Sequence, residues 1–281
     1  MKKILVCLIL CTWSPFSWAI DATAVPHVDK KARDGLEFDY AYAPPHKAYV
    51  IAPGGAWSWQ AGKSTVEEAK KASLDLCAKY TQQKCIVYAV DNDVVFERSE
   101  WIKLWGPYKK KAEAKQALTG ITIGDRFPNV EFTDPNGKKK TLSDLKGKVV
   151  FLHFWGQWCP SCRHEFSSII EMYRILKDTV GDEVEFVVLQ LREPIDESRN
   201  WARSKGLDAL PLSDSGVKDS EDNFIRIKGN KLMRDRNISR IFPTTYVLDK
   251  HGLVIFANYG SVENWTEYIP FFHDAVAESG K

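Results

Sequence analysis

The sequence predicts an α/β protein in which a mixed β-sheet flanked by helices, over residues 121–281, follows a small α+β domain over residues 20–105. Two observations favour this class. Nearly continuous apolar runs at 149–155 and 184–191 are typical of strands covered on both faces, and stretches with helical periodicity alternate with them. The composition, 44% hydrophobic and 27% charged, is that of a folded globular chain and argues against wholesale disorder or a coiled coil.

Residues 1–19 have the pattern of a secretory signal peptide. A basic start, Met-Lys-Lys, precedes an apolar run from Ile4 to about Trp13, and the segment ends in Ser-Trp-Ala at Ala19. This run of about 10 residues is shorter than a membrane span requires, so we expect cleavage after Ala19 rather than a retained anchor. The protein is therefore expected to be exported, periplasmic or secreted, without stable membrane insertion after signal cleavage.

The charge balance excludes a strongly basic protein. The chain has 39 Lys and Arg against 37 Asp and Glu, a net charge of +2, and we expect no nucleic-acid partner from that balance. The sequence also lacks a GxGxxG fingerprint, a P-loop and an HExxH motif. We therefore expect no nucleotide, flavin or metal cofactor.

The small domain is predicted as strand, helix and strand. Its helix begins with a capping box from Ser64 to Glu67 and runs to about Tyr80, whereas residues 20–45 are interpreted as an irregular lead-in. A lysine-rich segment over 106–120 is the predicted linker to the second domain. The two strands are expected at 48–52 and 85–90.

The second domain alternates in the order β-α-β-α-β-β-α, which implies a mixed sheet. It begins with a short strand at 132–133 that meets a turn, and residues 213–236, which are polar and follow no pattern, are interpreted as a surface insertion. The remaining elements are expected as strands at 149–155, 184–191, 244–248 and 253–258, and as helices at about 160–177, 196–205 and 263–277.

The pair Cys159 and Cys162 carries the chemistry, at the junction between a buried strand and the next helix. Pro160 lies in the first helical turn, where its missing N–H costs little. We expect Cys159 to be exposed and readily ionised, and Cys162 to be more buried but within disulfide reach. The spacing favours dithiol exchange, in which Cys159 attacks and Cys162 resolves. A structural zinc site, an inert disulfide and a peroxidatic cysteine are the alternatives.

Four segments resemble the TlpA/ResA-type thioredoxin-like thiol–disulfide oxidoreductases of the bacterial envelope, over about residues 121–279. In family order they are GDRFP at 124–128, LSDLKGK at 142–148, FWGQWCPSCRHE at 154–165 and FPTTYVLDKHG at 242–252. The resemblance implies a thioredoxin-like fold and dithiol exchange with protein thiols and disulfides as partners. It favours net reduction, with electrons supplied by a membrane donor.

The resemblance also implies a substrate-binding segment. Pro243 matches the family's cis-proline, and a substrate chain would pair with the main chain of Phe242 beside it. Thr244 continues this segment. Trp158 is expected to line the approach to Cys159.

Two further residues are candidates for handling the proton of Cys162. Glu165 matches an acidic residue that ResA-type proteins carry one helical turn after the second cysteine, although a solvated helix carboxylate is the alternative. His153 departs from thioredoxin itself, which has a buried aspartate at this position. It is interpreted either as a hydrogen-bonded core residue or as a group that takes this proton instead.

The other mature cysteines, Cys77 and Cys85, join a helix end to the next strand. An exported context predicts a structural disulfide between them, and a second redox couple that relays electrons to Cys159 is the alternative. Trp57 and Trp59 lie in the same domain, as core aromatics or as a binding surface.

The resulting functional hypothesis is an exported thiol–disulfide oxidoreductase that works as a reductase through its CxxC dithiol. Two alternatives remain. In the first, the thioredoxin-like part is a non-catalytic scaffold and residues 20–105 bind the partner. In the second, the protein is a disulfide oxidase or isomerase. The dipeptide between the cysteines, Pro160-Ser161, does not decide the direction.

Overall fold

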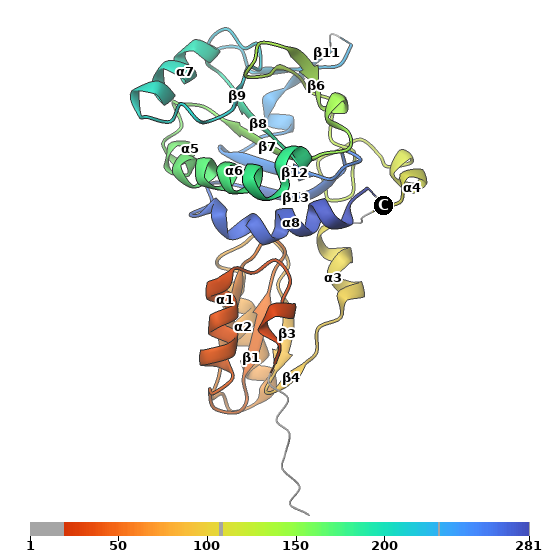
Figure 1. Ribbon diagram of the computed structural model, residues 1–281, viewed down its shortest axis with the longest axis vertical. Helices are drawn as coiled ribbons and strands as arrows, with labels where there is room; N and C mark the ends of the chain where they lie inside the picture. The colour runs from red at the N-terminus through yellow and green to blue at the C-terminus, as the bar shows by residue number, and fades with distance from the viewer. Residues whose placement is uncertain (1–19, 107–108, 230, 281) are drawn as a thin grey trace, which may run out of the picture.

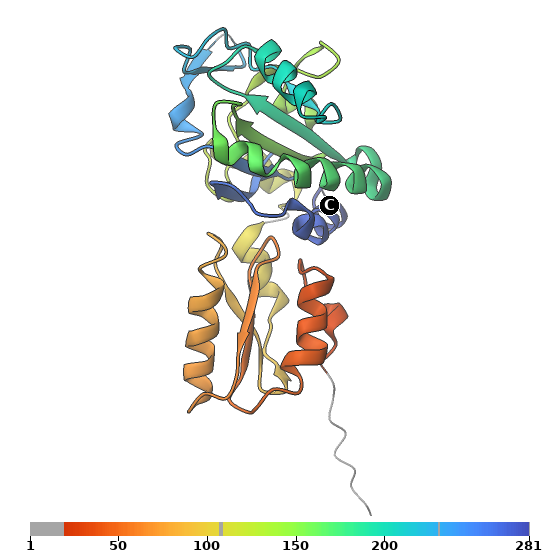
Figure 2. The ribbon, with the colours of Figure 1, turned by 90° about the vertical axis from the view of Figure 1, so that its left-hand side faces the viewer.

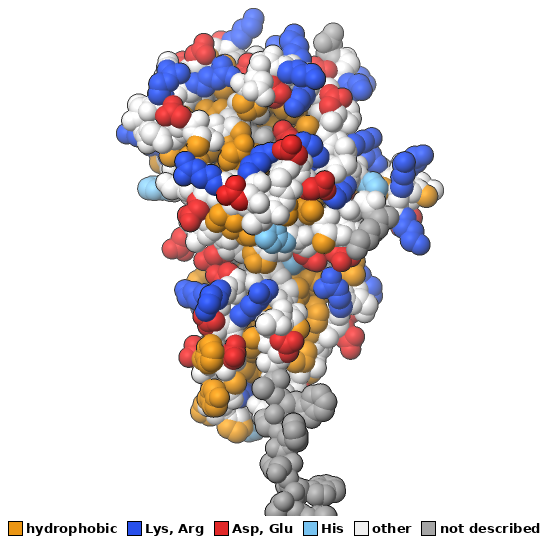
Figure 3. Space-filling model, in the orientation of Figure 1, with side chains coloured by type: hydrophobic (Ala, Val, Ile, Leu, Met, Phe, Trp, Pro, Cys, Tyr) orange, Lys and Arg blue, Asp and Glu red, His pale blue; other side chains and the backbone are white. Residues whose placement is uncertain are grey.

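The computed structural model describes residues 20–106, 109–229 and 231–280, so the predicted signal peptide lies outside the described residues. Residues 20–105 form a small α+β part, and residues 121–280 form a larger part with a mixed sheet, stacked on it (Figure 1). On the face shown in Figure 3, cationic and anionic side chains are interspersed, in keeping with the near-neutral net charge. Among the described residues, every helix is too short or too polar to span a lipid bilayer.

The amino-terminal sheet is antiparallel, with strand order β2-β1-β3-β4. Alternate residues of β1 face opposite layers: Tyr49 and Ile51 pack on one side, and Val50 packs on the other together with Ala52, which follows the strand. Two helical layers cover these faces, as Figure 2 shows. The elements are β1 (Ala48–Ile51), β2 (Trp57–Gln60), β3 (Ile86–Val90), β4 (Asp93–Val94), α1 (Lys30–Asp34) with its π-helical continuation η2 (Gly35–Tyr40), and α2 (Val66–Cys77).

The interpretation of residues 20–45 as an irregular lead-in is wrong. Ala32 of α1 and Leu36 of η2 are buried four residues apart, and Val25 and Val28, which precede α1, are buried in the same core cluster. The polar residues between them obscure these buried positions in the sequence. β2 was also missed, because the preceding glycines were interpreted as a turn and nothing more.

Helix α2 begins one residue later than expected. Thr65 is its N-cap and accepts the N–H of Glu68, whose carboxylate in turn accepts the N–H of Ser64. After β4, α3 (Arg98–Trp105) buries two tryptophans, and the predicted linker includes the short helix α4 (Lys111–Lys115).

The carboxy-terminal sheet has the order β13-β12-β7-β8-β9, with β7 at its centre and every residue of β7 buried. β8 and β9 run parallel to β7 and β12 runs antiparallel to it, so the predicted mixed sheet flanked by helices is confirmed. The main elements are β7 (Val149–Trp155), β8 (Val184–Gln190), β9 (Leu212–Ser213), β12 (Thr244–Leu248), β13 (Val254–Tyr259), α5 (Pro160–His164), α6 (Phe166–Val180), α7 (Ile195–Ser204), η6 (Trp265–Tyr268) and α8 (Ile269–Glu278).

Two expectations in this part need correction. The helix expected at 160–177 is broken at Glu165, which ends α5 and precedes α6. Residues 213–236 are more than a surface insertion: they contain the hairpin β10 (Phe224–Ile227) and β11 (Lys231–Arg234), which buries Ile225, and the following Asp235 is also buried. The charged residues of this segment hide its buried positions. A further hairpin is formed by β5 (Glu131–Thr133) and β6 (Lys139–Thr141).

The two parts share one hydrophobic core. A single cluster of buried residues includes Val28 and Trp105 from the first part and Phe271 from α8. His27 lies within this seam, with its ring centroid 4.3 Å from that of Trp105 and its Nε2 3.0 Å from Asp274. The contact between the parts therefore has a packed apolar centre, with polar contacts beside it such as those of Gln82 to Tyr259 and Gln83 to Ala257.

Candidate active site

Strand β7 delivers the cysteine pair. Phe151, His153 and Trp155 alternate along it and face the layer that contains α5, and the chain then turns so that Cys159 becomes the N-cap of α5. Cys159 and Cys162 form a disulfide with a Cα–Cα distance of 5.4 Å. Cys162 is fully buried and Cys159 is 4% exposed. The predicted order of burial is right, but Cys159 in this oxidised form is largely covered.

Polar groups converge on the sulfur of Cys159. The backbone N–H of Cys162 donates to it over 3.3 Å, and the hydroxyl of Ser161 lies 3.3 Å from it. The same hydroxyl donates to the carbonyl oxygen of Phe242 at 3.3 Å, so its single proton is shared between the two acceptors. Because α5 has only five residues, these local N–H and O–H groups rather than a long helix dipole are placed to stabilise a thiolate at Cys159 once the disulfide is reduced. Sequence reasoning missed Ser161, which it treated as part of an uninformative dipeptide.

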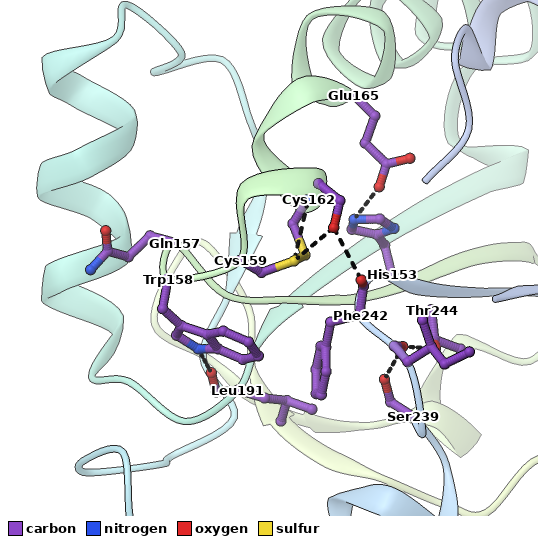
Figure 4. The surroundings of a disulfide bond; sticks show 12 residues. His153, Gln157, Trp158, Cys159, Cys162, Glu165, Leu191, Ser239, Phe242 and Thr244 are labelled. Carbon is purple, nitrogen blue, oxygen red and sulfur yellow. Dashed lines mark hydrogen bonds and ion pairs between the residues drawn. A yellow bond between two sulfur atoms is a disulfide. The ribbon is translucent and has the colours of Figure 1, made fainter. Parts of the chain in front are cut away.

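The predicted substrate segment lies beside the disulfide, as Figure 4 shows. The Phe242–Pro243 peptide bond is cis. Phe242 is half-buried, whereas Thr244 is buried and donates its hydroxyl to the carbonyl of Ile241 over 2.5 Å. Trp158 is 42% exposed, and its ring lies 5.0 Å from that of Phe242. The surface next to the cysteines is therefore aromatic, and the Thr244 side chain does not contribute to it.

Arg192 backs this aromatic surface, and sequence reasoning missed it. Its guanidinium lies 5.3 Å from the ring centroid of Phe242 and 5.9 Å from that of Trp158. Two contacts to the buried carboxylate of Asp235, at 2.5 and 3.0 Å, fix its position. The two partners are 43 residues apart in the chain, so no local sequence pattern predicts the pair.

Glu193 holds the loop that precedes Cys159. Both of its carboxylate oxygens accept the N–H of Gln157, at 2.9 and 3.0 Å, and the hydroxyl of Ser198 also donates to it. Burial raises the pKa of Glu193. This buried carboxylate was not singled out from the sequence either.

Glu165 and His153 face each other in the core behind the cysteines (Figure 4). Both side chains are fully buried, with Oε1 and Nε2 3.3 Å apart. The other carboxylate oxygen accepts the N–H of Val262 and the indole N–H of Trp265, each at 2.9 Å, and the other ring nitrogen lies 2.8 Å from the hydroxyl of Thr245. The interpretation of Glu165 as a solvated carboxylate is therefore wrong.

Burial moves the two pKa values in opposite directions. It raises the pKa of Glu165 to about 8, although the two N–H donors oppose the shift, and it lowers the pKa of His153 to about 3. At neutral pH the carboxyl is mostly protonated and the imidazole is neutral. The pair can therefore hold a proton behind the cysteines without burying a charge.

Nothing in the described ranges supports the zinc alternative. No group of three or more His, Cys, Asp and Glu residues able to hold a metal ion occurs there. Cys77 and Cys85 are joined to each other in the amino-terminal part, with a Cα–Cα distance of 6.3 Å.

A cysteine pair after the central strand of a mixed sheet, opposite a cis-proline, defines the class of thioredoxin-like proteins. Residues 123–257 match the AhpC/TSA family. ResA, a thiol-disulfide oxidoreductase from Bacillus thuringiensis (strain Al Hakam), is 34% identical over 135 residues, which cover 48% of this chain and 68% of ResA. The chain belongs to the ResA family of thiol-disulfide oxidoreductases.

Solved structures that resemble the chain are more distant in sequence. StoA from Bacillus subtilis is 17% identical, with a TM-score of 0.38, over 52% of this chain and 98% of StoA. A secreted thiol-disulfide isomerase from Corynebacterium glutamicum is 21% identical, with a TM-score of 0.39, over 52% of this chain and 84% of its own.

Proposed function

We propose that this chain is an exported reductase of protein disulfides that works in the periplasm or after secretion, with Cys159 and Cys162 as its dithiol. The observation that supports this most is the placement of the Cys159–Cys162 pair between an exposed aromatic surface and a buried proton-holding pair. We place the redox chemistry in a domain over residues 121–281, with residues 20–105 as a second domain packed against it.

The reaction begins from the reduced enzyme. The thiolate of Cys159 attacks one sulfur of a substrate disulfide, and the other substrate sulfur leaves as a thiolate that takes a proton from water. Phe242 offers its main chain to the substrate beside the scissile bond. The product of this step is a mixed disulfide between Cys159 and the substrate.

The second step resolves the mixed disulfide. Cys162 gives up its proton and attacks the sulfur of Cys159, which releases the second substrate sulfur and closes the enzyme disulfide. The two electrons that reduced the substrate came from the enzyme dithiol. Glu165 is the proton acceptor for Cys162 in the minority of molecules in which this carboxyl is ionised at neutral pH, and the neutral imidazole of His153 lies 3.3 Å from it.

The enzyme disulfide must then be reduced again. An oxidising compartment does not regenerate thiols by itself, so we propose a membrane-bound electron donor that presents a dithiol to Cys159. The same aromatic surface would serve the donor and the substrate in turn.

Two measurements test the direction and the residues. An insulin-reduction assay should show turnover that Cys159→Ser abolishes, and unchanged turnover in that variant would refute the proposal. The reduction potential of the Cys159–Cys162 couple should lie below about −200 mV, and a value near −120 mV would indicate an oxidase. Cys162→Ser should accumulate mixed disulfides with envelope proteins, and mass spectrometry of these adducts would identify the substrates.

A further inference from the structure

A groove of about 590 Å³ lies between the two parts of the molecule. Its floor comes from β2 and the turn before it, with the end of α2 and the start of α1 on either side. Its roof is the segment between β13 and α8. The lining residues on the roof are Asn258, Ser261, Val262, Glu263, Asn264, Glu267 and Tyr268.

The groove follows the open edge of β2. Residues 54–59 all line it. A groove on one face of the sheet would be lined by every second strand residue, because successive side chains point to opposite faces. The unbroken run therefore places the groove along the strand edge. In the described part of the chain, β2 is the outermost strand of its sheet and pairs only with β1.

Main-chain groups of β2 point into the groove. Ala52 donates its N–H to Ala56 at 2.8 Å, which makes this a hydrogen-bonded pair, and in an antiparallel ladder such pairs alternate with non-hydrogen-bonded ones. Counting along the ladder from this pair, Trp57 and Trp59 occupy non-hydrogen-bonded positions opposite Ile51 and Tyr49. Their N–H and C=O groups therefore point away from β1. The side-chain amide of Gln60 already donates to the carbonyl of Trp59 at 3.0 Å, which agrees with this direction.

The walls of the groove are acidic and aromatic. Asp29, Glu263 and Glu267 line it against a single cation, Lys31. Tyr80, which is 70% exposed, also lines the groove. Carboxylates and aromatic faces together suit the ammonium and guanidinium groups of Lys and Arg.

We propose that this groove binds an extended, basic polypeptide segment of a partner protein. The segment adds to β2 as a fifth strand through the main-chain groups of Trp57 and Trp59, and its Lys or Arg side chains meet Glu263 and Glu267. This gives the amino-terminal part a role beyond the proposed reductase function. The roof is also tied to the redox site, because Val262 donates its N–H to Glu165.

The test uses the full chain with both Cys159→Ser and Cys162→Ser, so that binding is measured without thiol chemistry and a failed reductase proposal does not affect the result. The probe is an acetylated nine-residue peptide of alternating Lys and Val, titrated by calorimetry. We expect saturable binding. A version of the same peptide with N-methylated backbone amides at all residues except the two ends should not bind, because it lacks the N–H donors that a β-strand needs.

Charge variants complete the test. Glu263→Gln with Glu267→Gln should weaken binding of the basic peptide about fivefold, as expected for two exposed charge pairs. Glu37→Gln, an exposed carboxylate outside the groove, is the matched control and should change nothing. The proposal is overturned if the basic peptide shows no saturable binding, if the N-methylated peptide binds equally well, or if an alternating Glu and Val peptide binds as tightly.

Discussion

Replacement of Glu165 by Gln should make the oxidised protein less sensitive to alkaline pH. Folding raises the pKa of Glu165 from 4.5 to about 8, so between these values the folded chain holds a proton that the unfolded chain has released. The free energy of unfolding therefore falls as pH rises through this window. Glutamine keeps an oxygen for the N–H of Val262 but cannot ionise, so this dependence should disappear.

The buried histidine sets the useful part of the window. Folding lowers the pKa of His153 from 6.5 to about 3, so below 6.5 the unfolded chain binds a proton that the folded chain lacks. Between 4.5 and 6.5 the two opposite slopes cancel. Above 6.5 Glu165 is the dominant contributor of these two groups, at up to about 1.4 kcal/mol per pH unit, which gives a loss of about 2 kcal/mol by pH 8.

Urea unfolding of the oxidised protein at pH 6.5 and pH 8 measures this directly. The fall in unfolding free energy between these two values should be about 2 kcal/mol smaller in Glu165→Gln than in the wild type. Glu171→Gln, an exposed carboxylate on α6, is the control and should follow the wild type. An identical fall in Glu165→Gln and the wild type would show that Glu165 is already ionised at pH 6.5, and the argument for a stored proton would fail.

Three further predictions concern other contacts. Ser161→Ala should raise the pKa of the attacking thiol, measured by the pH dependence of alkylation, and an unchanged profile would remove the hydroxyl from the argument. Asp235→Ala leaves Arg192 unpaired beneath the aromatic surface, so it should lower the unfolding free energy by about 3 kcal/mol and raise KM for a peptide disulfide. An unaltered KM would show that this surface does not contact the substrate. Replacing Cys77 and Cys85 together with Ala should lower the unfolding free energy by about 2.5 kcal/mol without changing insulin reduction, and lost turnover would instead support a relay.

Local patterns predicted the elements that carry the cysteines. The apolar run of β7 and the position of Cys159 at the start of the next helix depend on neighbours in the chain, and the structure has both at the predicted residues. The buried positions of the amino-terminal segment, at Val25, Val28 and Ala32, were overlooked because only tertiary packing distinguishes this segment from an irregular one.

The support around the cysteines was harder to predict, because it depends on contacts between distant segments. Arg192 meets Asp235 across a long separation, and Glu165 is buried only because Val262 and Trp265 close over it. A carboxylate one turn after a cysteine has the same local sequence signature whether it is solvated or buried. The resemblance to a family suggested a role for Glu165, whereas its pairing with His153 required the three-dimensional arrangement.

The continuous core between the two parts has a consequence for truncated forms of the protein. Phe271 on α8 packs against His27 and Trp105, with ring centroids 5.1 and 5.0 Å away, and a Cβ added at Gly54 would lie 2.7 Å from the ring of Tyr268. A variant without residues 20–105 would expose this apolar surface of α8 to water and become prone to aggregate. The larger part therefore depends on residues 20–105 to cover its apolar face, and an expression fragment of residues 121–281 alone should be less soluble than the full chain.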